Sequence, residues 1–335
     1  MAGGPRPPRA ASKNPSPLAA FQDTLRARHA RLSQLAPRSP SAPAARGPTG
    51  LRDRPPPERA MKGRVLIVAG SDSGGGAGIQ ADLKAVTALD AFGATAITAL
   101  TAQNTRGVDA VFPVPPDFIG RQMEVVLDDI GADAIKTGML HSAEVIDEVA
   151  RVYERLGRGA PLVVDPVMVA KGGARLLKSD AEGALRARLL PLATLLTPNI
   201  PEAEALTGVV IDSVDAMRSA AARLLAMGPR AVLLKGGHLP GATVVDVLRA
   251  APGPGASGLP EGEQLFEDAR IETRATHGTG CTLASAIAAG LAQGLALVPA
   301  IGRARRYLRE AMRSAPGLGQ GHGPLNHAHT ARPFP

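Results

Sequence analysis

The sequence has very few aromatic residues and a single cysteine. Its 335 residues include no Trp, two Tyr and six Phe, so Val, Leu, Ile and Ala must build the hydrophobic core. Cys281, being alone, cannot form an internal disulfide, which fits a reducing compartment. No apolar run reaches the roughly 18 residues that a membrane-spanning helix needs. We therefore expect a cytoplasmic protein that does not cross a membrane.

The positive charge of the chain is confined to its beginning. The formal net charge is +8, and residues 1–60 supply all of it, with 11 Lys and Arg against three acidic residues. The remainder holds 27 residues of each sign and is formally neutral. The part expected to fold thus lacks the basic surface that is typical of nucleic-acid binding, and we expect no nucleic-acid partner.

Residues 1–60 have the composition of a disordered extension. They contain 12 of the 30 prolines, together with much Ala, Arg and Ser. Such a segment buries too little apolar surface to fold. Its Arg-rich, acid-poor composition is also typical of an organelle transit peptide, although the many prolines count against that alternative.

From residue 64 onward, short apolar runs alternate with amphipathic segments of helix length. The expected strands are 65–70, 94–98, 134–138, 162–165, 195–199 and 231–237, and the expected helices include 79–89, 116–130, 142–156, 213–227 and 298–313. This alternation predicts an α/β fold with a mainly parallel sheet covered by helices on both faces. We expect one domain over residues 64–330, with the Pro/Gly-rich piece 252–262 as a surface excursion between two short strands.

A glycine-containing turn near the C-terminal end precedes an Ala- and Leu-rich helix that is expected to begin at Thr282. The turn, residues 275–281, has two glycines one residue apart and ends at Cys281. Unpaired N–H groups at a helix start, together with the helix dipole, form an anion site. A turn that simply caps a packed helix, with Cys281 as a small buried hydrophobe, is the open alternative.

Polar residues also follow several expected strands, at the edge of a parallel sheet where ligands bind. Neither a Walker sequence nor a complete Gly-x-Gly-x-x-Gly fingerprint is present. Seven motifs nevertheless occur in an order that resembles the hydroxymethylpyrimidine/phosphomethylpyrimidine kinases of thiamine synthesis, which belong to the ribokinase-like superfamily. These motifs are Ala69–Asp82, Thr98–Thr105, Lys136–Leu140, Val164–Met168, Thr197–Glu202, Leu234–His238 and Thr276–Cys281.

The resemblance, which covers roughly residues 64–330, implies a fold and an activity. The fold would be ribokinase-like. The activity would be ATP- and Mg²⁺-dependent phosphorylation of 4-amino-5-hydroxymethyl-2-methylpyrimidine to its monophosphate, and of the monophosphate to the diphosphate. Relatives of this kind suggest a homodimer. The sequence ends shortly after the kinase pattern, so no second enzymatic domain is expected.

The resemblance also implies which residues hold the phosphates and the metal ion. The backbone N–H groups at the anion turn would face the γ-phosphate, and two further residues would meet the ATP phosphates. A magnesium ion would be supported by an Asn-x-x-Glu pattern and a nearby carboxylate. These three groups are Gly278, Thr279, Gly280 and Cys281; Lys235 and Thr276; and Asn199, Glu202 and Asp165. Without the resemblance, Glu202 is interpreted as a carboxylate in the first turn of a helix, where it favours the helix dipole, and Lys235 as a solvated lysine in a loop.

For the pyrimidine, the resemblance implies two polar side chains that hydrogen-bond to the ring and three residues that contact it. Gln103 would donate and accept hydrogen bonds, and Asp82 would accept from the exocyclic amine. Gly70, Met139 and Val167 would line the ring, although Met139 could equally be core filling.

Cys281 stands where sugar kinases of the superfamily carry an aspartate base. A helix start favours a thiolate, which could take the alcohol proton; alternatively the N–H of Cys281 alone matters. We expect His277 to have a hydrogen-bonding, structural role.

Two other functions remain open at this point. A pyridoxal kinase uses the same scaffold, although the pair Gln103-Asn104 favours a pyrimidine. A non-catalytic pyrimidine sensor would need no phosphate-binding residues, so the joint presence of Cys281, Lys235 and Glu202 favours an enzyme.

Overall fold

The computed structural model describes residues 61–168, 176–177, 180–251 and 262–331. The disorder expected for residues 1–60 therefore concerns a segment outside the described residues. The same holds for the surface excursion expected at 252–262, except for Gly262, which is described as the first residue of a strand. Among the described helices, none is both long enough and apolar enough to cross a membrane.

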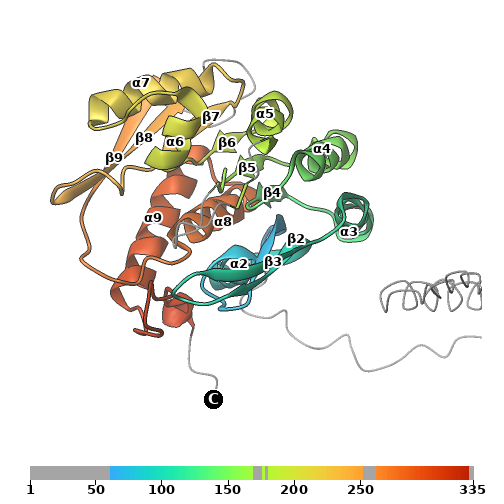
Figure 1. The fold of residues 1–335 in the computed structure, drawn as a ribbon, viewed down its shortest axis with the longest axis horizontal. Coiled ribbons are helices and arrows are strands. Elements are labelled where there is room, and N and C mark those ends of the chain that lie inside the picture. The colour runs from blue at the N-terminus through green and yellow to red at the C-terminus, as the bar shows by residue number, and fades with distance from the viewer. Residues whose placement is uncertain (1–60, 169–175, 178–179, 252–261, 332–335) are drawn as a thin grey trace, which may run out of the picture. The chain divides into compact units, whose positions relative to one another are not determined.

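A sheet of nine strands forms the centre of the fold (Figure 1). The strand order is β3-β2-β1-β4-β5-β6-β7-β8-β9. The six strands from β2 to β7 in this order are parallel, and β3, β8 and β9 are antiparallel additions at the two edges. The strands are β1 Arg64–Asp72, β2 Phe92–Gln103, β3 Val108–Pro113, β4 Ala134–Thr137, β5 Leu162–Val164, β6 Leu195–Leu196, β7 Ala231–Leu234, β8 Thr243–Ala250 and β9 Gly262–Ala269.

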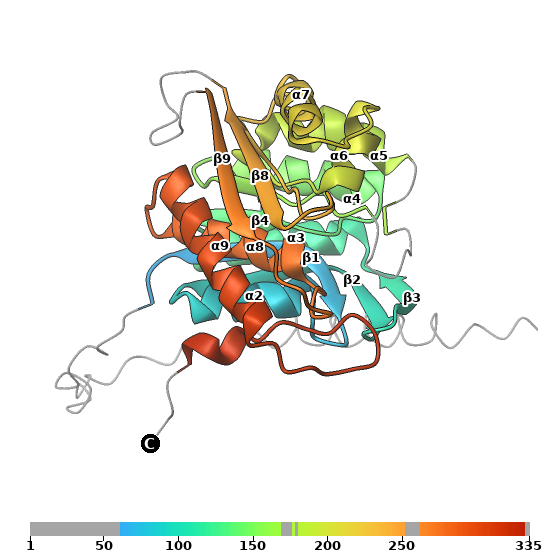
Figure 2. The ribbon, with the colours of Figure 1, turned by 90° about the vertical axis from the view of Figure 1, so that its left-hand side faces the viewer.

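Helices cover both faces of the sheet, as Figures 1 and 2 show. They are α2 Gly78–Ala88, α3 Pro116–Asp129, α4 Ala143–Val152, α5 Ala181–Ala184, α6 Ile200–Thr207, α7 Val214–Leu225, α8 Thr279–Ala292 and α9 Leu297–Arg313. π-helical turns follow α4 at Tyr153–Gly157 and α5 at Leu185–Leu189, and 3-10 turns lie at Leu190–Leu192 and His327–Thr330. The predicted α/β fold with a mainly parallel sheet is confirmed.

Strand β1 shows why a continuous apolar run is needed at the centre of such a sheet. Its side chains alternate between the two faces. Leu66 and Val68 belong to the core formed with α3, α4 and α7, whereas Val65 and Ile67 belong to the core formed with α2, α8 and α9. All four side chains are buried, because helices cover the sheet on both sides.

The structure corrects the expected start of the last buried helix. Helix α8 begins at Thr279 with Gly278 as its N-cap, three residues before the predicted Thr282. Gly278 has a φ of 78°, and a Cβ at this position would lie 1.9 Å from the carbonyl oxygen of Gly76. Gly278 is thus the one position of the turn that requires glycine, because its backbone has a positive φ and lies against the β1–α2 loop. Gly280 and Cys281 consequently belong to the first helical turn.

Candidate active site

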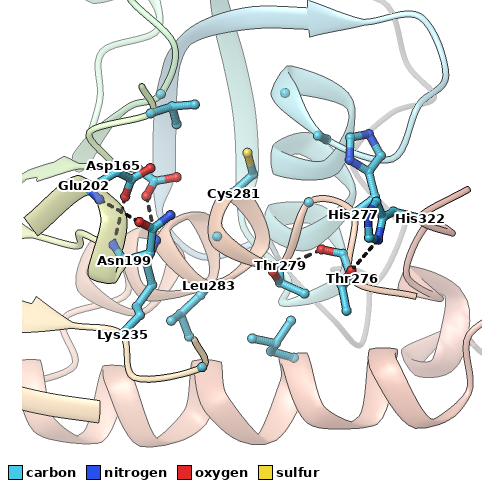
Figure 3. A pocket seen from close by; sticks show the side chains of 18 of the residues that line it. Asp165, Asn199, Glu202, Lys235, Thr276, His277, Thr279, Cys281, Leu283 and His322 are labelled. Carbon is cyan, nitrogen blue, oxygen red and sulfur yellow. Dashed lines mark hydrogen bonds and ion pairs between the residues drawn. The ribbon is translucent and has the colours of Figure 1, made fainter. Parts of the chain in front are cut away.

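A cavity of about 990 Å³ lies at the carboxyl ends of the parallel strands and includes the start of α8. It is lined by every residue that the sequence suggested for the site except Asp82. Figure 3 shows that the labelled residues form two groups, with Asp165, Asn199, Glu202 and Lys235 on one side of Cys281, and Thr276, His277 and His322 on the other. The topology therefore brings together residues from chain segments more than 200 positions apart.

The start of α8 leaves three backbone donors without a helical acceptor. The first intrahelical hydrogen bond runs from the N–H of Thr282 to the carbonyl of Gly278, at 2.9 Å. The N–H groups of Thr279, Gly280 and Cys281 precede it and have no acceptor within the helix. Since these residues line the cavity, their donors and the positive end of the helix dipole are available to an anion there.

Lys235 places a positive charge beside this helix start. A Cβ at Gly280 would lie 3.1 Å from the Lys235 Nζ, so glycine leaves room for the ammonium directly over the first turn. The same Nζ donates to Asp165 Oδ1 at 3.0 Å, and Thr197 Oγ1 donates to the same oxygen at 3.2 Å. Although burial opposes the charged form, Asp165 and Glu202 outweigh it and raise the pKa of Lys235. The lysine therefore stays charged.

Asn199 and Glu202 form a capping box at the start of α6. The Glu202 N–H donates to Asn199 Oδ1 at 2.9 Å, and the Asn199 N–H donates to Glu202 Oε2 at 2.8 Å. Burial raises the pKa of Glu202 to about 7; Lys235 opposes this shift, and Asp165 adds to it. Glu202 is thus both a structural cap and a carboxyl group that can change its charge near neutral pH.

The end of the cavity away from Lys235 and Glu202 has apolar side chains and one amide. Met139 is 7% exposed, and its sulfur would lie 3.4 Å from a Cβ added at Gly70. Val167 and Gln103 also line this cavity. The Gln103 backbone is fixed by Ser73, whose hydroxyl accepts from its N–H at 2.8 Å and donates to its carbonyl at 2.9 Å.

Asp82 does not reach the cavity, which corrects the expectation that it accepts from a ligand amine. Its side chain is fully buried, and both of its carboxylate oxygens accept from Lys136 Nζ at 2.9 Å. Ser285, on the buried face of α8, donates to Asp82 Oδ1 at 2.7 Å. Lys136 itself lines the cavity. Asp82 is therefore linked to the cavity wall by its contact with Lys136, a residue that was quoted in a sequence motif without a role.

The expected ionisation of Cys281 is also corrected. Cys281 is half-buried at the cavity wall, and burial raises the pKa of its thiol to about 12. The charge of Lys136 opposes this shift, whereas Asp82 and Asp165 strengthen it. The helix start was expected to favour a thiolate, but the low polarity around the sulfur and two nearby carboxylates outweigh it. Without a bound ligand, the thiol is neutral at pH 7.

His277 forms the hydrogen bond that was predicted for it. Its Nε2 lies 2.8 Å from Asp72 Oδ2, and the histidine side chain is buried. Although burial opposes it, hydrogen bonds from His277 and from the N–H groups of Ala77 and Gly74 hold the pKa of Asp72 below its usual value. Asp72 is a contact that sequence analysis missed, since its partner lies 205 positions away and the Gly-rich loop gave no sign of it.

The sequence was compared with families of known proteins, and one family matches most of the chain. Residues 72–326 match the phosphomethylpyrimidine kinase family, which covers more than half of the chain. The chain belongs to this family. The resemblance noted in the sequence is thereby confirmed.

Two curated relatives bear names that agree with this assignment, and a solved structure of a pyridoxal kinase shares the fold. A hydroxymethylpyrimidine/phosphomethylpyrimidine kinase of Streptomyces coelicolor is 49% identical over 78% of the chain and 93% of its own length. The thiamine biosynthesis bifunctional protein ThiED of Geobacter sulfurreducens is 55% identical over 79% of the chain, which spans about half (52%) of that protein. The crystal structure of an ADP complex of Bacillus subtilis pyridoxal kinase superimposes with a TM-score of 0.72 at 38% identity, covering 80% of the chain and 98% of the other.

Proposed function

We propose that the protein phosphorylates 4-amino-5-hydroxymethyl-2-methylpyrimidine with ATP, and then phosphorylates the monophosphate to the diphosphate. Both steps belong to thiamine biosynthesis, and the names of the Streptomyces and Geobacter relatives support this assignment. We further propose that residues 64–330 form a single kinase domain and that the enzyme works in the cytoplasm.

One observation carries the proposal: the start of α8 and the ammonium of Lys235 adjoin each other in a cavity that also holds Gln103. Phosphoryl transfer requires positioning and neutralisation of charge on the transferring group rather than elaborate covalent chemistry. The N–H groups of Thr279, Gly280 and Cys281 would bind the γ-phosphate, while Lys235 and Thr276 would meet the phosphates of ATP. The phosphate acceptor would lie toward Gln103.

The carboxylates beside Lys235 fit a magnesium ion that arrives with ATP. Mg²⁺ prefers oxygen ligands and is commonly bound through one or two carboxylates together with substrate phosphates. Asp165 and Glu202 provide two such carboxylates on the cavity wall, and Asn199 would support Glu202. A bound Mg²⁺ supplies charge neutralisation on the phosphates. Its positive charge would also favour the ionised form of Glu202.

At the acceptor end, Gln103 would bind the edge of the pyrimidine that carries the ring nitrogen and the amine. Met139 and Val167 would contact the ring faces, and Gly70 would let the ring approach the backbone. This set is small and largely apolar, as expected for a neutral heteroaromatic alcohol.

A pyridoxal kinase activity is the second candidate, because the Bacillus subtilis structure that superimposes on the chain bears that name. The amide of Gln103 favours a substrate with an amine beside a ring nitrogen, whereas pyridoxal carries a hydroxyl group on its ring. A non-catalytic sensor is disfavoured by the conjunction of Lys235, Asp165, Glu202 and the free N–H groups of α8.

We also propose that the enzyme is a homodimer. Exposed apolar side chains stand at one edge of the sheet, and a second copy would cover them. They are Leu100 on β2, Phe112 directly opposite it on β3, and Phe118 on the adjoining α3, and Phe112 is 67% exposed. Light scattering should give a dimer mass for the full chain, and Phe112→Asp should lower that mass toward a monomer.

Steady-state kinetics with Gln103→Ala test the substrate assignment. Loss of a buried hydrogen-bonding partner costs about 1–3 kcal/mol, so KM for the pyrimidine should rise about tenfold or more while KM for ATP changes little. Asn104→Ala is the matched control, because Asn104 is the exposed neighbour and does not line the cavity. Equal increases in both KM values for Gln103→Ala would contradict a specific contact with the pyrimidine.

A further inference from the structure

The hydrogen bonds around Gln103 fix which end of its amide faces which neighbour. Asp72 accepts four hydrogen bonds: from the N–H of Gly74 on Oδ1 at 2.8 Å, from those of Gly76 and Ala77 on Oδ2 at 3.1 and 2.8 Å, and from His277. A carboxyl group with so many donors around it is a carboxylate and can only accept. The His277 Nε2, 2.8 Å from Asp72 Oδ2, must therefore carry a proton and donate it.

This proton determines what Gln103 can present to His277. The same His277 Nε2 lies 3.3 Å from one end of the Gln103 amide, the position occupied by Nε2. Two N–H donors cannot bond to each other, so the amide oxygen must face the histidine, where it shares the proton that His277 directs at Asp72. The two ends of a glutamine amide are distinguished by their partners rather than by their shape.

The hydrogen bonds of Thr101 require the same orientation of the Gln103 amide, at the other end of that amide. Its hydroxyl lies 2.8 Å from the carbonyl oxygen of Ser71 and 3.1 Å from the second end of the Gln103 amide. A hydroxyl has one proton, and the carbonyl of Ser71, which can only accept, takes it. The remaining lone pairs of Thr101 then need a donor, which the amide nitrogen of Gln103 supplies.

We infer that Asp72, His277 and Thr101 form a polarity relay that holds the Gln103 amide with its oxygen toward His277 and its nitrogen toward Thr101, and so sets the direction in which the substrate ring binds. This inference rests on the proposed function. Each relay neighbour uses one hydrogen-bonding direction of the amide, which leaves one N–H and one lone pair of Gln103 for a ligand in the cavity that it lines.

The orientation of the ring follows from this arrangement. A 4-aminopyrimidine offers a ring nitrogen that accepts, beside an amine that donates. The ring nitrogen must lie on the Thr101 side and the amine on the His277 side. The hydroxymethyl group is attached next to the amine carbon, so it lies beyond the amine, toward the turn from His277 into Gly278 that opens α8. The reversed amide would direct the alcohol away from the phosphate site, and Thr101 and His277 are thus positioning residues for the reaction.

Kinetics of the full chain with Thr101→Val and Thr101→Ser test the relay. Valine keeps the shape of threonine and removes the hydroxyl, so kcat/KM for the pyrimidine should fall about fivefold while KM for ATP stays unchanged. Loss of the hydrogen bond to the Ser71 carbonyl should also lower the midpoint of thermal unfolding. Thr101→Ser keeps the hydroxyl and should behave as the wild type. Thr95→Val is the matched control, on the same strand but away from the cavity.

A substrate analogue separates positioning from a merely structural role. The ratio of kcat/KM for the pyrimidine to that for 5-hydroxymethyl-2-methylpyrimidine, which lacks the amine, should fall about fivefold in Thr101→Val. An unchanged ratio, or an equal loss in Thr101→Ser, would overturn the relay. Failure of the wild type to bind or phosphorylate the pyrimidine would instead overturn the proposed function, and the relay with it.

A measurement without any substitution completes the test. The ¹⁵N resonance of His277 Nε2 in labelled full-length protein should show a protonated nitrogen at neutral pH. A nitrogen without a proton would overturn the relay, whatever the kinetics of the variants.

Discussion

At the residue scale, burial decides the chemistry of the site more strongly than position in the sequence. Cys281 heads a helix, where a thiol ordinarily ionises more readily, yet burial raises its pKa to about 12. A neutral thiol cannot take a proton from the substrate. We therefore propose that Cys281 contributes through its backbone N–H, which every residue except proline would supply at this position.

Cys281→Ala should keep kcat within about tenfold of the wild type, because alanine retains the N–H. A thiolate base with a pKa near 12 would make kcat rise about tenfold per unit between pH 7 and 9, since the ionised fraction grows tenfold per unit below the pKa. We expect no such rise in a pH–rate profile. A steep rise that disappears in Cys281→Ala would instead restore the base assignment.

Asp82→Ala should destabilise the fold rather than weaken one substrate contact. It would leave the ammonium of Lys136 buried without its counter-charge, which typically costs about 3–5 kcal/mol of unfolding free energy. Urea unfolding measures the loss. Asp133→Ala, which breaks an exposed ion pair with Arg64, is the control and should cost much less. Wild-type stability of Asp82→Ala together with a raised KM for the pyrimidine would contradict this account.

At the element scale, the N-caps of α6 and α7 are similar in structure but differ in their position relative to the cavity. Helix α6 and helix α7 are both capped by a side chain, Asn199 and Ser213 respectively, but only Asn199 lines the cavity. Asn199→Ala and Ser213→Ala should each lower the free energy of unfolding by about 1 kcal/mol. Only Asn199→Ala should also raise KM for Mg·ATP, because it releases Glu202. A similar KM in both variants would show that the α6 cap supports the fold alone.

The sequence allowed the elements to be predicted better than their ends and their contacts. The apolar run of β1 and the helical pattern of α2 were placed to within a few residues, because burial on two faces and helical periodicity are local signals. The start of α8 was misplaced, since the constraint on Gly278 comes from the carbonyl of Gly76, far away in the chain. For the same reason, the partners Lys136 of Asp82 and Asp72 of His277 could not be found from spacing.

At the scale of the whole molecule, the charged extension and the candidate site are separate features of the chain. The excess positive charge belongs to residues 1–60, whereas every residue that is assigned a role in binding or catalysis lies between Gly70 and Cys281. Removal of residues 1–60 should therefore leave kcat/KM within about threefold, less than the tenfold change that about 1.4 kcal/mol would cause. A larger loss in steady-state assays would mean that the extension contributes to catalysis.

The most direct test of the central claim is ADP formation by the full chain with Mg·ATP and each acceptor in turn. We predict turnover with 4-amino-5-hydroxymethyl-2-methylpyrimidine and with its monophosphate, and a lower kcat/KM with pyridoxal. ADP formation with neither pyrimidine would contradict the account, and a higher kcat/KM with pyridoxal would assign the site to the second candidate function.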